Sequence, residues 1–167
     1  MSSNTLKRVL AVTAVALVPV MGLATNASAT TVAGSKAVSY IEKHDMGKPY
    51  SESSGRLGPN HFDCSGLIYS AFKAVGHDMG KTHTTTNTEW SYLSKKHQTS
   101  SKHQTKAHHT VQVGDILFFW NHGSVQHVGI YIGHNEMIDA NSTHGKVKID
   151  DAFYNWGFSY ITFGWVK

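Results

Sequence analysis

The spacing of apolar residues predicts helices in the first half of the chain and strands in the second half. Apolar side chains recur about every three or four positions over residues 37–46 and 64–75, as on one face of a helix. A shorter helix is expected over residues 87–93. From residue 113 onward, short runs of β-branched and aromatic residues alternate with turn-forming residues. Helices followed by a series of antiparallel strands are typical of an α+β fold.

Two of the expected strands place polar residues on a common face. The strands are expected at residues 113–120, 127–132, 137–140, 147–149 and 160–166. Within the second of these, the even-numbered residues are apolar, so His127 points to the opposite face. Within the third, the even-numbered residues are again apolar and Asp139 points away from them. If the apolar residues of both strands share one face, His127 and Asp139 share the other, and a shift of one residue would separate them.

A helix is expected to begin at Cys64, the only cysteine of the chain. Asp63 immediately precedes it and is a suitable N-cap, because its carboxylate accepts hydrogen bonds from N–H groups of the first turn. A thiol in that turn also lies at the positive end of the helix dipole, which favours the thiolate. Since the thiolate is the reactive form in cysteine catalysis, Cys64 is a candidate nucleophile.

A nucleophilic thiol requires a base, and the base requires a partner that orients it. The chain has 12 histidines, so position must identify the base. His127 and Asp139 are the candidates, because the strand pattern places them together. Without Cys64, the same two residues would more simply be polar surface residues of a half-buried hairpin.

The first residues have the features of a secretory signal peptide. Lys7 and Arg8 precede an apolar run over residues 9–24, and Ala27-Ser28-Ala29 provides small residues at a cleavage position. The run is short for a membrane span, so we expect no stable membrane anchor. We therefore expect residues 1–29 to be removed, leaving one catalytic domain over residues 30–167.

Charge and cysteine content narrow the functional classes. Two of the 15 lysines and arginines lie in residues 1–29, leaving 13 against 11 acidic residues and a formal charge of +2. This charge is too small to favour nucleic-acid binding, but it suits weak attraction to a polyanionic surface such as a bacterial wall. A single cysteine in a secreted chain is a buried residue, a dimer bridge or a reactive thiol. The residues around Cys64 favour the reactive thiol.

Residues 95–109 differ in composition from the rest of the chain. They contain four lysines, four histidines, no acidic residue and no large apolar residue. We expect an exposed and mobile loop, since this composition cannot form a core. The loop is either a solvated insertion or a cationic arm that contacts anionic wall polymers. A metal site is a third option, although histidines in a flexible segment lack rigid ligand geometry.

Four motifs occur in an order that resembles the NlpC/P60 family of bacterial cell-wall endopeptidases. They are Gly47-Lys-Pro-Tyr50, Phe62-Asp-Cys-Ser-Gly66, Gly114-Asp115, and His127-Val-Gly-Ile-Tyr-Ile-Gly133. The resemblance implies a papain-like α+β domain in which the helix carrying the nucleophile packs on an antiparallel sheet. It also implies hydrolysis of peptidoglycan stem peptides, typically at the bond between γ-D-glutamate and the following diamino acid.

The resemblance assigns the nucleophile to Cys64 and the base to His127. Asp139 occupies the third polar position, where many family members have histidine. A carboxylate can also orient an imidazole, so we expect activity with an altered pH profile. The mechanism needs no metal and no cofactor.

Tyr50 matches a tyrosine whose hydroxyl helps to stabilise the oxyanion. The chain lacks the Trp-Gly-Gly run that commonly follows this tyrosine, and Tyr50 could instead be a half-buried aromatic residue near a turn. Asp63 and Ser65 match positions that bind the free amine of the substrate's N-terminal alanine. Asp63 could also serve only as the helix cap, and the two roles are compatible.

Two alternatives remain open from the sequence. One is an amidase or bridge endopeptidase of the related CHAP type, which also places its cysteine before its histidine. The other is an inactive wall-binding or metal-binding module in which residues 95–109 do the binding. Permuted acyltransferases of related architecture fit less well, because their histidine precedes the cysteine. We expect a secreted monomer associated with the cell wall.

Overall fold

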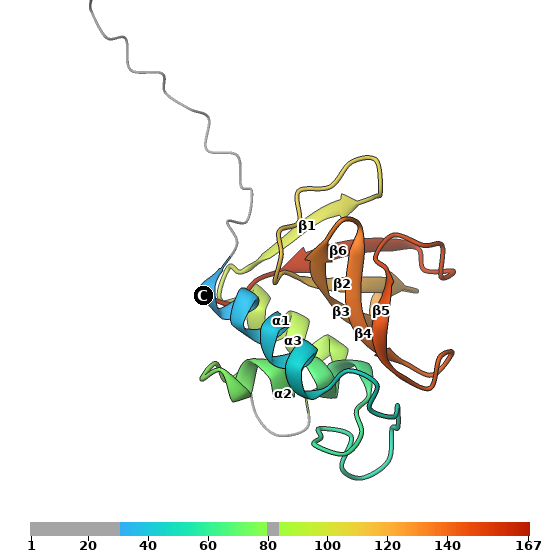
Figure 1. The fold of residues 1–167 in the computed structure, drawn as a ribbon. Coiled ribbons are helices and arrows are strands. Elements are labelled where there is room, and N and C mark those ends of the chain that lie inside the picture. Colours follow the sequence, from blue (N-terminus) through green and yellow to red (C-terminus); the bar gives the residue numbers. More distant parts are fainter. Residues whose placement is uncertain (1–30, 80–83) are drawn as a thin grey trace, which may run out of the picture.

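The computed structural model describes residues 31–79 and 84–167. These residues form three helices and six strands, in agreement with the expected α+β class (Figure 1). The signal peptide expected over residues 1–29 lies outside the described residues. None of the described helices combines the length and the apolar character needed to cross a bilayer. The elements are α1 (Val32–His44), α2 (Cys64–Ala74), α3 (Thr86–Lys95), β1 (Thr99–Gln104), β2 (Ile116–Asn121), β3 (Ser124–Gly133), β4 (Glu136–Asn141), β5 (Lys146–Asp151) and β6 (Tyr160–Gly164).

The strands form one antiparallel sheet in the order β1-β6-β2-β3-β4-β5. β2 to β5 follow one another along the chain and in space, whereas β6 inserts between β1 and β2. The three helices lie together on one side of the sheet (Figure 1). α2 packs against α1 and also against β3 and β4, the strands expected to carry the polar pair. This arrangement brings the start of α2 to the middle of the sheet.

The core has two parts because both faces of the sheet are covered. Between the helices and the sheet lies a large apolar cluster that includes Ile41, Leu67, Phe72, Phe118 and Ile130. Alternate residues of the same strands form a second cluster on the other face, where irregular segments after β5 supply the cover. This second cluster includes Leu117, Phe119, Tyr131, Met137, Phe163 and the partly buried Phe153, Trp156 and Phe158. Burial of each large side chain contributes about 1.5–3 kcal/mol.

Each helix begins at a residue whose side chain caps it. Thr31 accepts a hydrogen bond from the Gly34 N–H, and Thr85 forms a reciprocal capping box with Thr88. At α2, Asp63 Oδ1 accepts from the Gly66 N–H at 2.6 Å. The cap predicted for Asp63 is therefore confirmed, and it fixes Cys64 as the first residue of the helix.

The prediction of a loop over residues 95–109 is wrong for residues 99–104, although most of the segment is exposed as expected. Lys95 ends α3, and Thr99–Gln104 form β1, which pairs with β6 at the edge of the sheet. Backbone hydrogen bonds hold an edge strand in place, so the strand can form without apolar side chains. His103 also stacks on Tyr160 with the ring centroids 4.2 Å apart. Lysine on an edge strand additionally disfavours pairing with another chain.

The loop that precedes Cys64 packs tightly on the first turn of α2. The Asp63 N–H donates to the Arg56 carbonyl oxygen at 3.2 Å. A Cβ atom placed on Gly66 would lie only 1.9 Å from that same oxygen. Gly66 is therefore required because the loop backbone occupies the space of a side chain.

Gly66→Ala should destabilise the protein although alanine is the better helix former. The Cβ atom must displace the Arg56 carbonyl, and overpacking of this kind costs about 1–3 kcal/mol. Chemical denaturation of both proteins measures the change in the free energy of unfolding. Ser70→Ala in the same helix is the control and should change that free energy by less than about 0.5 kcal/mol. Equal stability of the wild type and Gly66→Ala would contradict the packing described for this loop.

Candidate active site

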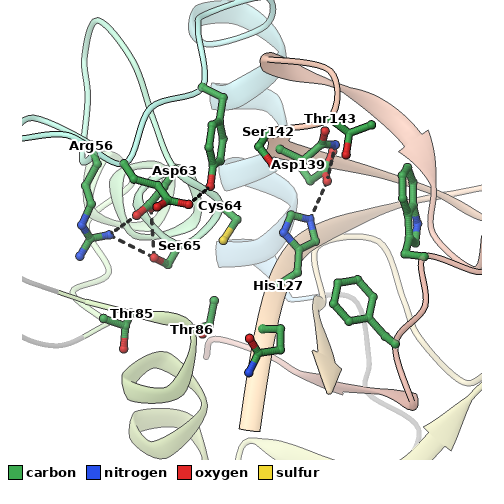
Figure 2. Close-up of a pocket in the computed structure, with 16 residues that line it drawn as sticks. Arg56, Asp63, Cys64, Ser65, Thr85, Thr86, His127, Asp139, Ser142 and Thr143 are labelled. Atoms are coloured by element: carbon green, nitrogen blue, oxygen red, sulfur yellow. Dashed lines mark hydrogen bonds and ion pairs between the residues drawn. The ribbon is translucent and has the colours of Figure 1, made fainter. Parts of the chain in front are cut away.

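Cys64 lies in a cavity of about 580 Å³ between the start of α2, the start of α3 and the sheet. The residues around it come from elements far apart in the sequence. Figure 2 shows the sulfur of Cys64 directed toward the ring of His127, with Asp139 on the far side of that ring. The cavity is lined by Tyr50, Glu52, Arg56, Asp63, Cys64, Ser65, Thr85, Thr86, Gln126, His127, Asp139, Asn141, Ser142, Thr143, Trp156 and Phe158.

The structure brings His127 and Asp139 together as the strand pattern predicted. The register of β3 and β4 pairs Ile130 with Ile138, and both isoleucines belong to the helix-side cluster. The polar residues consequently share the opposite face, where His127 Nε2 and Asp139 Oδ2 are 2.6 Å apart. Gly129, between His127 and Tyr131 on this face, leaves room for β4, because a Cβ atom there would lie 2.6 Å from the Met137 sulfur and 3.3 Å from the Asp139 Cβ atom.

A β-bulge at the beginning of β3 directs His127 into the cavity. Phe119 pairs with His127 while the next residue of β2, Trp120, pairs with Val125, which leaves Gln126 as an extra residue. Bulges of this kind increase the local twist and redirect side chains next to active sites. The sequence pattern did not predict this irregularity. The imidazole lies 5.6 Å from the Phe119 ring and stacks on Phe158 at 6.2 Å.

The surroundings of His127 favour the imidazolium ion. Burial by itself would lower the pKa of the imidazole, but hydrogen bonds to Asp139 and Cys64 outweigh burial and raise the pKa to about 9. Asp139 is almost completely buried, with 1 % of its surface exposed, so its attraction for the imidazolium is weakly screened. His127 should therefore carry a proton at neutral pH.

Asp139 is itself held by a hydrogen-bond network. The side-chain amide of Asn141 donates to Asp139 Oδ2 and to Asp150 Oδ2, at 3.0 Å each. Lys148 and His144 contact the same Asp150 carboxylate at 2.9 and 3.1 Å. Burial would raise the pKa of Asp150, but the hydrogen bond from Lys148 and the others around it lower that pKa. The network fixes the direction in which Asp139 Oδ2 faces the imidazole.

Tyr50 reaches the cavity from the segment after α1. Its hydroxyl donates to Glu52 Oε1 at 2.6 Å. Burial raises the pKa of this hydroxyl above its ordinary value, and the hydrogen bond to Glu52 acts in the same direction. Tyr50 therefore remains a protonated hydrogen-bond donor at the cavity wall.

Asp63 and Ser65 lie beside Cys64, but Arg56 already contacts both. The Arg56 guanidinium forms an ion pair with Asp63 Oδ2 at 2.7 Å and donates to Ser65 Oγ at 3.1 Å. Ser65 in turn donates to Asp63 Oδ1 at 3.1 Å. These two residues thus form part of an internal cluster that borders the cavity.

Three residues of the site were not found from the sequence. Arg56 had one signal, since it is the only arginine after Arg8. Asn141 follows Asp139 at the spacing of one strand face, which places both on the same side. Glu89 gave no signal, because acidic residues are common in the first turn of a helix.

Glu89, in the first turn of α3, is buried and interacts with the charges of Cys64, Asp63 and Arg56. None of its surface is exposed, and neither carboxyl oxygen has a hydrogen-bond partner among the described residues. Burial raises the pKa of this carboxyl well above its ordinary value, and the neighbouring Cys64 and Asp63 charges act in the same direction. The neutral acid therefore adds no negative charge near Cys64 and Asp63.

The structure describes no cluster of three or more histidine, cysteine or carboxylate side chains arranged to hold a metal ion within residues 31–79 and 84–167. The groups that the site does offer are a thiol, an imidazole held by a carboxylate, a hydroxyl donor and helix N–H groups. These groups suit nucleophilic attack on a carbonyl with proton transfer to the leaving group.

Asp139→Asn should lower the pKa of His127 from about 9 toward its ordinary value of 6.5. The substitution removes the charge that stabilises the imidazolium while nearly preserving the shape of the side chain. NMR titration of the His127 ring protons measures the change. Asp151→Asn is the matched control, because Asp151 pairs with Lys106 and has no contact with His127. An unchanged pKa in Asp139→Asn would mean that the carboxylate does not stabilise the imidazolium.

The sequence is similar to proteins of one known family. The NlpC/P60 family model matches residues 47–163. A probable endopeptidase p60 of Listeria grayi is 34% identical over 148 residues, which cover 87% of this chain and 25% of that protein. The peptidoglycan endopeptidase RipB of Mycobacterium tuberculosis is 31% identical over 128 residues, covering 68% of this chain and 47% of RipB. The chain thus spans a quarter to a half of the length of these relatives.

Solved structures share the fold. The P60 domain of an antigen from M. avium subspecies paratuberculosis is 27% identical with a TM-score of 0.54, covering 78% of this chain and 96% of that domain. The structure of the peptidoglycan hydrolase RipB from Mycobacterium tuberculosis gives 26% identity and a TM-score of 0.52, covering 77% of this chain and 65% of RipB. The papain-like α+β fold expected from the motifs is confirmed. By its motifs, fold and family match, the chain belongs to the NlpC/P60 family.

Proposed function

We propose that this protein is a cysteine endopeptidase that hydrolyses peptidoglycan stem peptides. One observation carries the proposal. The Cys64 sulfur is directed toward the His127 imidazole in an open cavity (Figure 2), and Asp139 holds the far side of that imidazole at 2.6 Å. Membership of the NlpC/P60 family and the names of relatives such as RipB support peptidoglycan as the substrate.

The bond cleaved in this proposal joins the γ-carboxyl group of D-glutamate to the following diamino acid. The Cys64 thiolate attacks the γ-glutamyl carbonyl, and a tetrahedral oxyanion forms. N–H groups at the start of α2 lie next to the sulfur and stabilise this charge. The protonated hydroxyl of Tyr50 is the second donor, and it exchanges its bond to Glu52 for one to the oxyanion.

His127 then transfers its proton to the leaving amine. The C–N bond breaks, the diamino acid departs and the acyl group remains on Cys64 as a thioester. Neutral His127 next removes a proton from water, which attacks the thioester and regenerates the thiolate and the imidazolium. Asp139 keeps the imidazole in one orientation through both steps and favours its charged form.

Secretion and wall association complete the proposal. The basic and apolar pattern of residues 1–29 supports export, and peptidoglycan is reached outside the cytoplasmic membrane. Lysines and histidines along β1 and the following turn offer positive charge to anionic wall polymers. β1 is separated from β3, the strand that carries His127, by β6 and β2 in the sheet, so wall attachment through β1 leaves the cavity accessible.

Cys64→Ala should abolish hydrolysis, because no other side chain can take the place of the sulfur. Loss of a catalytic nucleophile typically reduces turnover on the order of 10⁶-fold. Mass spectrometry of digested muropeptides should show a disaccharide–L-Ala–D-Glu product with the wild type and none with Cys64→Ala. A stem peptide released whole from its sugar would instead identify an amidase. Full hydrolysis by a folded Cys64→Ala protein would contradict the thiol mechanism.

The pH profile of kcat/KM should fall on the alkaline side with a pKa near 9. The His127 pKa is raised to about 9, so the imidazolium persists below that pH and is lost as the pH rises through it. Proton transfer to the leaving amine is then impaired. Steady-state rates between pH 5 and 10 on one synthetic stem peptide measure the profile. An alkaline limb centred near 6.5 would mean that Asp139 does not raise the His127 pKa in solution.

A further inference from the structure

The proposed chemistry determines which side of Cys64 each part of the substrate occupies. His127 protonates the leaving amine, so the diamino acid lies on the His127 side of the sulfur. The acyl part of the substrate, with its N-terminal alanine, must then extend to the other side. Figure 2 shows Asp63 and Ser65 on that side, with Arg56 beyond them.

The Arg56 side chain is held firmly at that end of the cavity. Its guanidinium bonds Asp63 Oδ2 at 2.7 Å, Ser65 Oγ at 3.1 Å and the Thr84 carbonyl oxygen. The backbone carbonyl of Arg56 is fixed by Asp63 N–H and packs against Gly66. Only 20% of the side-chain surface is exposed. The guanidinium is therefore a fixed part of the cavity wall, unlike the charge of a flexible surface side chain.

The same contacts leave Asp63 little capacity to bind a second cation. Its Oδ1 atom accepts from the Gly66 N–H and from Ser65, and its Oδ2 atom pairs with Arg56. Buried Glu89 adds no compensating negative charge, since its carboxyl is neutral. A substrate ammonium group beside Asp63 would therefore meet an ion pair, in which repulsion by the guanidinium offsets the attraction that the carboxylate alone would supply.

The guanidinium retains donors for an oxygen atom. Arginine has five N–H donors, and its hydrogen bonds to the described residues occupy three of them. The remaining donors suit the carbonyl oxygen of an amide. When alanine is joined to another group through an amide bond, as in a sugar-linked stem, its N terminus presents such an oxygen and carries no charge.

We propose that Arg56 determines specificity at this end of the cavity by selecting stem peptides with an acylated N terminus over those with a free amine. The inference rests on the proposed function and deepens it. It departs from the role that the family resemblance implied for Asp63 and Ser65, because in this chain their polar atoms bind Arg56. The protein would act on stems still attached to the glycan strand and spare released peptides.

The test compares two synthetic tripeptides, L-Ala-γ-D-Glu-diamino acid with a free N terminus and the same peptide N-acetylated. Wild-type protein should cleave the acetylated peptide with a kcat/KM about ten- to hundredfold higher, the range expected for a charge-assisted contact. Equal rates, or preference for the free amine, would overturn the inference while leaving the proposed function intact.

Substitution of Arg56 tests the residue itself. Arg56→Gln removes the positive charge and frees Asp63, so the preference should move about tenfold or more toward the free amine. Arg56→Lys keeps a positive charge beside Asp63 and should retain the wild-type preference. Melting temperatures of both variants identify any loss of folding, and the ratio of the two substrates is unaffected by the fraction of active protein. An unchanged ratio in Arg56→Gln would overturn the assignment.

The pH dependence of that ratio separates charge from size. An α-amino group has a pKa of about 8, so above pH 9 the free peptide is neutral and its disadvantage should shrink. Changes at the catalytic pair affect both peptides equally and cancel in the ratio. A ratio independent of pH would overturn repulsion by Arg56 as the cause. The charged or titratable groups that line the whole cavity are Tyr50, Glu52, Arg56, Asp63, Cys64, His127 and Asp139, and buried Glu89 interacts with the charges of Cys64, Asp63 and Arg56.

A binding experiment measures the same preference without cleavage. Calorimetry with Cys64→Ala protein should show tighter binding of the acetylated peptide. If neither peptide binds and neither is cleaved by the wild type, both the proposed function and this inference are overturned. Cleavage of both peptides without discrimination overturns the inference alone.

Discussion

The register between β3 and β4 is the constraint on which the site depends. Pairing of Ile130 with Ile138 buries one apolar set from the two strands, which also includes Val128 and Ala140, beneath the helices. The same pairing leaves His127 and Asp139 on a common face, joined at 2.6 Å. A shift of one residue would turn the apolar set of one strand to the other face and separate the polar pair, so the energy of core packing also maintains the geometry of the site. One strand register thus determines both the packing of the core and the position of His127 relative to Asp139.

At the start of α2, Asp63 likewise serves more than one structural role. Asp63 caps the helix, accepts from Ser65 and pairs with Arg56, and Arg56 in turn donates to the Thr84 carbonyl oxygen, so these contacts together connect the helix, the preceding loop and the segment before α3. Removal of that carboxylate would loosen three elements together. The position of the Cys64 sulfur therefore depends on polar contacts made on the side of the helix away from His127.

Much of the fold could be predicted, because local patterns determine it. The start of α2 followed from Asp63 and the apolar stripe after Cys64, and the strand faces followed from simple alternation. β1 could not be predicted, since its polar sequence forms a strand only through backbone pairing with β6, a partner distant in the sequence. The bulge before His127 and the ion pair of Arg56 with Asp63 could not be predicted for the same reason. Each depends on contacts between separate segments, which a pattern of residues along the chain does not encode.

The place of β6 in the sheet bears on how the protein reaches its folded state. β6 is the last strand along the chain, yet it is hydrogen-bonded on both edges, to β1 and to β2. The sheet is therefore incomplete until residues 160–164 have been added, and the contacts they make are highly non-local. Until the last residues of the chain are available, β1 lacks its neighbour in the sheet and β2 lacks one of its two.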